Sequence, residues 1–484
     1  MQRQRLIRNQ NISTVLLIAA CFFLTSSVWM SWEYHLTDFL DTLTVDYLSM
    51  VAGYLLQAAG IALFSLMIQK RPHWFRPGLL TLILLLFLGS SAVSILPSSP
   101  GVSIVSGLFM NLLCGLIAGF YLHVLTFLTG PSHKGLVFGS GYGCAVICTW
   151  LFSRIRGEGS FLTSPYALIA YAAVTGLIIL WIVLSGKDSF RFGMVPPEIS
   201  PAESANAAAS ADRFGGHSAQ KLRSLFLQTG IIVFLFSLVK NLGFGFPTAD
   251  ILGGVSVELS RIFYAAGLVC AGYIIDRNRK QGALCAAASL VISFIGLALS
   301  GEQISAMVIW CLEYLFFGFF SVFRIVVFSD LCRSCGCAYL AGLGLCLGRV
   351  GDAAGTVICN ACADHKFVLV VGTAALFILS LFLFYRFFLQ TWILPQPAVR
   401  TPDEQETLER FSMINQLSFR EKDVLKEILS GKTNAEIAGT LFVSESTIKF
   451  HVHNLLKKTG CRNRSELISK YKAEVYQILP GQPD

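Results

Sequence analysis

Charged side chains are scarce in this sequence, and their scarcity is uneven. Only 14% of the 484 residues are Asp, Glu, Lys or Arg, against about 25% in a typical soluble domain. This shortage excludes a single soluble globular protein, and the 54% share of hydrophobic residues excludes a disordered chain. Residues 1–390 are about 11% charged and residues 391–484 about 27%. The composition therefore predicts a membrane domain followed by a small cytosolic one.

Recognisable catalytic and metal-binding motifs are also missing. The sequence shows no phosphate-binding loop, nucleophile elbow or paired catalytic carboxylates, so we expect neither an enzyme nor a bound cofactor. Two cysteine groups leave metal binding or redox sensing open, although apolar packing is the favoured interpretation because neither has a second ligand pair. These groups are Cys332, Cys335 and Cys337, and Cys359 and Cys362.

Residues 1–390 contain apolar segments long enough to cross a bilayer, which takes about 20 residues of helix. Lys and Arg crowd into alternate connections, such as residues 70–76 and 277–280. Because positive loops stay cytoplasmic, we expect a multi-pass protein with both termini in the cytoplasm. The predicted spans lie near residues 12–30, 46–68, 78–96, 102–128, 135–153, 165–184, 224–243, 252–275, 282–300, 304–328, 336–360 and 367–390.

The longest connection divides these spans into two groups of six. Residues 186–222 are rich in Ala, Ser, Pro and Gly, which is typical of a flexible linker. They separate the helices predicted in residues 1–185 from those in residues 223–390. After the eighth span the chain reads Gly272-Tyr-Ile-Ile-Asp276-Arg277-Asn-Arg279-Lys280.

This six-plus-six plan and loop motif resemble the major facilitator superfamily. The resemblance implies an all-α, polytopic twelve-helix membrane bundle with a transporter-like plan. The equivalent loop after the second span, residues 69–76, keeps basic charge but departs from the family pattern because it has no acidic residue.

Ionisable residues inside the spans are the candidates for a ligand site, because each is costly in lipid. Two interpretations stay open. In the first, residues three apart pair on one helical face: Glu258 with Arg261, and Arg349 with Asp352. In the second, a central cavity binds an anionic or polar aromatic ligand, with Arg261 and Arg349 as charge partners. The candidate ligand-binding residues, mostly in the second group of spans, are Arg261, Glu258, Glu313, Arg349, Asp352 and His123.

The last 94 residues change to short amphipathic segments. Residues 391–412 are predicted to be a linker and residues 475–484 a tail. Two helices predicted from Asn434 and after Ser444, joined by a tight turn, form a helix-turn-helix. Residues 413–474 carry 11 Lys plus Arg and 7 Asp plus Glu, most of the excess from Lys449 onward. This is the charge pattern expected where a helix contacts DNA phosphates.

This stretch resembles the LuxR-type DNA-binding domain. The matching runs are Leu417-Ser-Phe-Arg-Glu421, Asn434-Ala-Glu-Ile-Ala438, Val443-Ser-Glu-Ser-Thr447-Ile-Lys449-Phe-His451 and Leu456-Lys-Lys-Thr-Gly460. The resemblance implies a four-helix domain that binds double-stranded promoter DNA and forms a homodimer through its fourth helix. The implied base contacts are Lys449, Phe450 and His453. The implied phosphate contacts are Thr447, Lys457 and Lys458, and Asn434 and Asn454 complete the predicted DNA-binding set. The predicted dimer contacts are Leu467, Ile468 and Tyr471.

Together these features predict a one-component transcription regulator in a bacterial cell membrane, whose twelve-helix domain senses a small molecule. No phosphate-accepting receiver domain fits between the last span and residue 413, so the signal should come from the membrane part or a partner. The alternative is a working transporter with a DNA-binding tail. It is less favoured, because the first half shows no carboxylates suited to coupling.

Overall fold

A computed structural model describes residues 2–96, 99–130, 133–155, 164–185, 217–244, 260–298, 303–335, 341–389 and 404–478. These residues form helices and short connections, with no strand among them. The chain divides into two compact units, Met1–Gln390 and Thr391–Asp484. The division coincides with the change in charge content, and the all-α prediction is confirmed.

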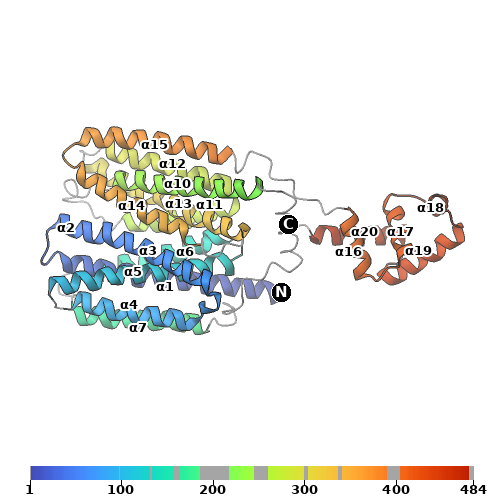
Figure 1. Cartoon of the computed structure of the whole chain (residues 1–484), viewed down its shortest axis with the longest axis horizontal. Helices are drawn as coiled ribbons and strands as arrows, with labels where there is room; N and C mark the ends of the chain where they lie inside the picture. Colours follow the sequence, from blue (N-terminus) through green and yellow to red (C-terminus); the bar gives the residue numbers. More distant parts are fainter. Residues whose placement is uncertain are drawn as a thin grey trace. The chain divides into compact units, whose positions relative to one another are not determined.

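Within its described residues, the first unit contains six long helices up to residue 185 and six from residue 217 onward (Figure 1). The first of the second six begins at His217, inside the predicted linker over residues 186–222. A short helix α2 (Thr42–Asp46) and a π-helix η1 (Tyr47–Ala52) lead into α3, and a 3₁₀ turn η2 (Pro72–Trp74) follows it. The long helices are α1 (Gln2–Leu36), α3 (Gly53–Lys70), α4 (Pro77–Ile95), α5 (Pro100–Leu128), α6 (Lys134–Ile155), α7 (Pro165–Ser185), α10 (His217–Phe244), α11 (Ser260–Arg277), α12 (Arg279–Ala298), α13 (Gln303–Cys335), α14 (Leu343–Ala361) and α15 (Lys366–Phe388).

Nine of these helical segments, counted in the described part of the chain, are long and apolar enough to cross a membrane. The other three are α11, α12 and α14. Ionic residues dilute the apolar character of two of them, since α11 carries Arg261 and α14 carries Arg349 and Asp352. Three of the candidate ligand residues thus lie on two of the helices that fall short, α11 and α14.

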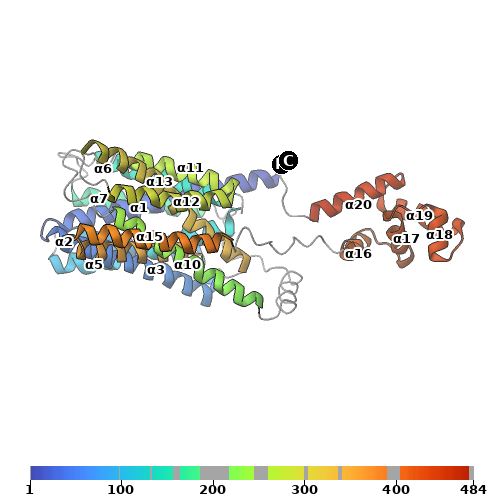
Figure 2. The same cartoon turned by 90° about the horizontal axis from the view of Figure 1, so that it is seen from above.

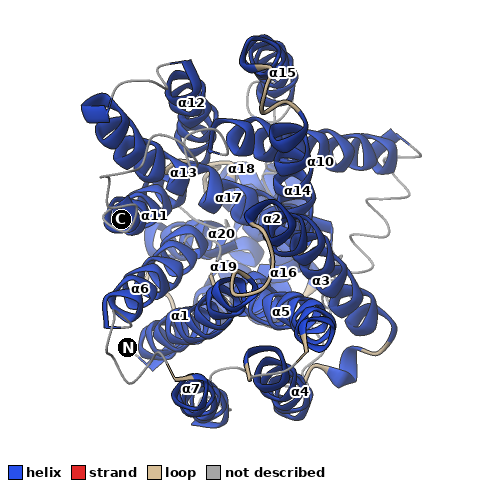
Figure 3. Ribbon diagram, turned by 90° about the vertical axis from the view of Figure 1, so that its left-hand side faces the viewer, coloured by secondary structure: helices blue, strands red, loops and turns tan. Residues whose placement is uncertain are grey.

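The two groups of six helices lie side by side with roughly parallel axes (Figures 1 and 2). Across the boundary α6 packs against α11, and α3 packs against α14. Figure 3 shows α4 and α7 at one edge of the bundle and α12 and α15 at the opposite edge. These outer helices expose large apolar side chains, including Leu85, Trp181 and Phe367. Such a surface suits lipid, so the central helices are the ones that can enclose a site.

Glycines permit the close contact between the two halves. A Cβ atom added to Gly139 of α6 would lie 2.2 Å from the carbonyl oxygen of Leu268 in α11. One turn earlier, Gly135 and Gly272 face each other in the same way. Small residues at spacings of four let helix backbones approach in this manner, and packing accounts for this glycine stripe.

The second unit is a small helical domain with its own core. Its helices are α16 (Glu404–Ile414), α17 (Phe419–Leu429), α18 (Asn434–Leu441), α19 (Glu445–Thr459) and α20 (Arg464–Ile478). Capping boxes begin two of them: Ser418 with Glu421 at α17, and Thr433 with Glu436 at α18. The core includes Leu425, Ile437 and Leu455, each fully buried. The helices predicted from Asn434 and after Ser444 thus appear as α18 and α19.

Helix α16 corrects the predicted linker over residues 391–412. Its first residue is Glu404, and Leu408 and Phe411, three apart on one face, enter the core of the domain. The Phe411 ring packs edge-on against Tyr471 of α20 at 5.2 Å between centroids. The burial of Leu408 and Phe411 makes this acidic segment part of the second unit.

We predict that Phe411→Ala will lower the free energy of unfolding of residues 391–484 by about 3–5 kcal/mol, because it removes a buried ring. Urea unfolding of this segment will measure the change. The control is Met413→Ala on the same helix, since Met413 is 75% exposed. Equal stability of the two variants would contradict the placement of α16 in the core.

Candidate functional site

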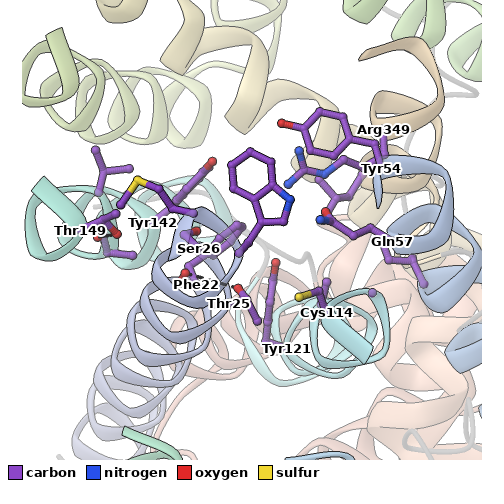
Figure 4. A pocket seen from close by; sticks show the side chains of 18 of the residues that line it. Phe22, Thr25, Ser26, Tyr54, Gln57, Cys114, Tyr121, Tyr142, Thr149 and Arg349 are labelled. Carbon is purple, nitrogen blue, oxygen red and sulfur yellow. Dashed lines mark hydrogen bonds between the residues drawn. The ribbon is translucent and has the colours of Figure 1, made fainter. Parts of the chain in front are cut away.

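A cavity of about 230 Å³ lies inside the helical bundle, between its two halves (Figure 4). Side chains of α1, α3, α5, α6, α11, α13 and α14 line it, and most of them come from the first half. The lining residues are Phe22, Thr25, Ser26, Trp29, Met30, Tyr54, Gln57, Ile61, Cys114, Gly115, Ala118, Tyr121, Tyr142, Ala145, Val146, Thr149, Arg261, Tyr264, Tyr314, Leu345 and Arg349.

Two of the predicted ligand residues, Arg261 and Arg349, line this cavity. The Arg349 guanidinium lies over the ring of Tyr54, 4.3 Å from its centroid. Arg261 directs a guanidinium nitrogen to the sulfur of Met30 at 3.5 Å. Among the described residues, no carboxylate oxygen lies within 4 Å of either guanidinium. Both side chains therefore present positive charge to the cavity.

The expected pairing of Arg349 with Asp352 is wrong, because Asp352 faces other helices of the second half. Its carboxylate accepts a hydrogen bond from Lys240 Nζ at 2.7 Å and lies 3.8 Å from Arg324 Nη1. All three side chains are buried. Asp352 thus neutralises cations of α10 and α13 and does not line the cavity.

Other predicted ligand residues also lie elsewhere. His123 is buried in an aromatic group, 4.5 Å from Phe75 and 4.8 Å from Phe127 between ring centroids, and it does not line the cavity. Glu313 is buried on α13 next to a lining residue but is not one itself. Glu258 lies outside the described residues. Of the cysteine groups, Cys359 packs against α10, with its sulfur 3.7 Å from the carbonyl oxygen of Leu242.

Most of the candidate ligand residues were predicted in the second half, but most of the residues that line this cavity belong to the first half. The first half supplies the rings of Phe22, Trp29, Tyr54, Tyr121 and Tyr142. Phe22 and Tyr142 stack with 4.0 Å between centroids and 11° between planes. Charged residues mark a candidate site in an apolar span because they are costly there. Aromatic residues suit such a span and therefore do not mark a site.

An ionic network joins the two halves at the end of the bundle where α6 begins. The Asp276 carboxylate accepts the backbone N–H groups of Gly135 and Leu136 at 2.9 and 2.7 Å. Arg279 bridges Asp276 at 2.8 Å and Asp330 at 2.9 Å. Asp330 in turn binds Lys134 at 3.0 Å.

Both Asp276 and Arg279 belong to the loop motif singled out in the sequence. A carboxylate at a helix N-terminus is favoured by the helix dipole and by free N–H groups. This interhalf latch (Lys134, Asp276, Arg279 and Asp330) therefore holds one end of the bundle closed.

The second unit presents the candidate DNA interface on α19. Phe442 closes α18 in the left-handed conformation, φ 54°, and the chain turns into Ser444, which caps α19. Ile448 and Leu455 face the core. On the other face Lys449, Phe450 and His453 are exposed, and Lys457 extends this exposed surface. Thr447, Asn454 and Asn434 are half-buried around it. This arrangement presents a basic helix face that can enter a DNA groove.

Lys458 differs from the other predicted DNA contacts because it is held within the domain. Its Nζ donates to Glu421 at 2.7 Å and to the backbone carbonyl of Gln416 at 3.0 Å. Burial would raise the pKa of Glu421, but hydrogen bonds from Lys458 and Ser418 outweigh burial and lower that pKa. Lys458 therefore ties α19 to the capping box of α17, and a phosphate contact would have to break this pair.

The predicted dimer contacts also lie inside the domain. Leu467 is fully buried, Tyr471 packs on Phe411, and Ile468 packs against the same core. A dimer formed through α20 would use its exposed positions, such as Ser465, Glu466 and Ser469.

Residues 415–471 match the GerE family, the luxR family of bacterial regulatory proteins. This region is 57% identical over 51 residues to YhcZ, an uncharacterized transcriptional regulatory protein of Bacillus subtilis, covering 10% of this chain and 24% of that protein. It is 47% identical over 53 residues to the nitrate/nitrite response regulator protein NarL of Escherichia coli, covering 11% and 24%. The chain spans about a quarter of the length of these relatives.

The helical bundle is similar to solved structures of the major facilitator superfamily. The proton:xylose symporter XylE aligns with 80% of this chain and 96% of its own, with a TM-score of 0.55 and 13% identity. The human organic anion transporter MFSD10 aligns with 79% and 98%, with a TM-score of 0.50 and 15% identity. At these identities the likeness shows the fold. The chain thus joins a major-facilitator-type bundle to a LuxR-type helix-turn-helix domain.

We predict that Lys458→Met will destabilise residues 391–484 by about 1–2 kcal/mol, discounted for the partial exposure of this lysine. Because the pKa of Glu421 is lowered on folding, its contribution is present above the unfolded pKa, about 4.3, and is lost as pH falls through the folded value. Urea midpoints measured between about pH 6 and 3 should therefore fall less steeply in the variant than in the wild type.

The control for this prediction is Lys457→Met, the exposed neighbour on the same helix. It removes the same charge without removing the pair and should leave the midpoints unchanged. If both variants unfolded alike, the assigned role of Lys458 in packing would be wrong.

Proposed function

We propose that this protein is a membrane-embedded one-component transcription regulator. In this proposal the bundle senses a small molecule in its central cavity, and the helix-turn-helix binds promoter DNA. The observation that carries the proposal is the covalent union of a bundle enclosing a cavity with a domain of LuxR type. The protein would reside in a bacterial cell membrane with both termini in the cytoplasm, as the distribution of Lys and Arg indicates.

The connection between the two units is short. Residues 390–403 separate α15 and its last turn from α16, and even a fully extended chain of this length reaches about 50 Å. Since α16 belongs to the core of the second unit, the DNA-binding domain stays near the bilayer. Promoter DNA must therefore come to the membrane.

Signal transfer in this proposal is a population shift. Both halves of the bundle line the cavity, so a ligand that fits one arrangement of the halves better favours that arrangement. The interhalf latch stabilises one such arrangement at the end where α6 begins. Release of the interhalf latch would change how the DNA-binding domain is presented to DNA or to a second copy of this chain.

DNA recognition is assigned to the exposed face of α19. Lys449, Phe450 and His453 would contact base edges. Thr447, Lys457, Asn434 and Asn454 would contact the backbone. Binding as a homodimer is expected because operator half-sites are commonly read by symmetric pairs of helix-turn-helix domains.

A working transporter is the alternative function. The fold supports it, but among the described lining residues there is no carboxylate that could carry a coupling proton. Uptake by proteoliposomes against a gradient would favour this alternative.

We predict that Lys449→Ala will weaken specific DNA binding about 10- to 100-fold, because it removes a base-edge contact. DNA fragments captured by the purified chain would first define the operator, and footprinting with the full chain would then compare variants. Lys426→Ala is the control, since Lys426 is exposed on α17, away from α19. Equal footprints for both variants would reject the assignment of α19.

We predict that Asp276→Asn will change the basal output of a reporter carrying that operator about fivefold or more, since allosteric couplings typically span 5- to 150-fold. DNA binding by the isolated residues 391–484 cannot change, because this variant leaves them intact. Arg277→Gln, an exposed neighbour in the same motif, should leave the basal output unchanged. An unaltered output from Asp276→Asn would contradict a role of the latch in signalling.

A further inference from the structure

The charge of the cavity is one-sided. Among its lining residues in the described part of the chain there are two guanidinium groups, Arg261 and Arg349, and no carboxylate. A charge in a site of low polarity is costly unless an opposite charge compensates it. The cavity is therefore suited to a ligand that brings negative charge.

The acid closest to Arg349 along α14 is already engaged. Asp352, three residues from Arg349 on α14, binds Lys240 at 2.7 Å and lies 3.8 Å from Arg324. The Asp352 carboxylate thus already compensates two buried cations, Lys240 and Arg324, in addition to any effect on Arg349. The Nε atom of Arg349 is buried without a hydrogen-bond acceptor. A guanidinium in this state can accept a carboxylate in the forked geometry that Arg favours.

The wall that the first half contributes is aromatic. Phe22 and Tyr142 stack at 4.0 Å, and Trp29 and Tyr54 lie 6.1 Å apart at 24° between planes. In Figure 4 the labelled rings of the first half lie around the same space that Arg349 borders. Flat rings of this kind hold a flat ring by offset stacking or edge contact.

The size of the cavity limits the ligand. Its volume of about 230 Å³ is below the 300–1,000 Å³ typical of sites for drug-sized molecules. A ligand of one or two fused rings with a short acidic group fits this space.

We propose that the cavity binds a planar aromatic carboxylate of one or two rings, with the carboxylate on Arg349 and Arg261 and the ring among Phe22, Trp29 and Tyr142. The acid end then belongs to the second half of the bundle and the ring to the first. A ligand held in this way bridges the two halves. This inference rests on the proposed role of the cavity as the sensory site and gives that site its ligand class.

The test uses the purified full chain in detergent and isothermal titration calorimetry. The probes are benzoate and indole-3-carboxylate, with neutral benzamide and saturated cyclohexanecarboxylate as their matched counterparts. We expect at least one aromatic acid to bind, and benzamide to bind about 10- to 100-fold more weakly than benzoate, since it forms no charge-assisted pair. Cyclohexanecarboxylate should also bind at least about 5-fold more weakly, because it cannot stack on the rings.

Variants locate the contact. Arg349→Gln should weaken binding of the aromatic acid about 10- to 100-fold and leave benzamide binding unchanged. Arg349→Lys keeps the charge without the fork and should give an intermediate affinity. Arg277→Gln, exposed outside the cavity, should behave like the wild type. A single symmetric peak in size-exclusion chromatography will show that each variant is folded.

Three outcomes would overturn the ligand class: no binding of either aromatic acid, equal affinity for acid and amide, or full affinity in folded Arg349→Gln. Failure of the proposed function looks different, because binding is measured without DNA. If an aromatic acid binds through Arg349 while the operator reporter ignores it, the ligand class stands and the regulatory proposal fails.

Discussion

The cost of an uncompensated charge in a membrane governs the arrangement of the first unit. Lys240 and Arg324 are buried on α10 and α13, and Asp352 on α14 lies between them. This pairing directs the Asp352 carboxylate toward α10 and α13, whereas the neighbouring Arg349 lies over the Tyr54 ring of α3. Arg349 keeps its charge exposed to the cavity because Asp352, on the same helix, neutralises Lys240 and Arg324 instead.

Carboxylates also compensate basic side chains at helix ends in both units. Asp276 satisfies the N–H groups at the start of α6 and holds Arg279, and Asp330 holds both Arg279 and the buried Lys134. In the second unit Glu421 satisfies its capping box and holds Lys458. Asp276 and Glu421 each serve a helix N-terminus and a basic side chain together, and so each links two elements.

Hydropathy and caps predicted the helices of this chain well, because span length and capping chemistry are local properties. The pairing of Arg349 with Asp352 could not be judged locally. Residues three apart share a face only approximately, and Lys240 on another helix decides which partner Asp352 meets. The aromatic wall was also hidden, since Tyr142 or Phe22 suits a lipid-facing surface as well as a cavity. Likewise, acidic neighbours concealed the two apolar positions of α16, Leu408 and Phe411.

A sensory bundle works only if its ligand prefers one arrangement of the halves, since a ligand that binds both equally shifts nothing. The cavity meets this condition because its two kinds of contact are divided. The guanidinium groups come from α11 and α14, whereas most rings come from α1, α3, α5 and α6. Any change in the spacing of the halves alters one contact relative to the other. In the proposed mechanism, occupancy of the cavity would therefore be coupled to the interhalf latch, which also joins α6 to the second half.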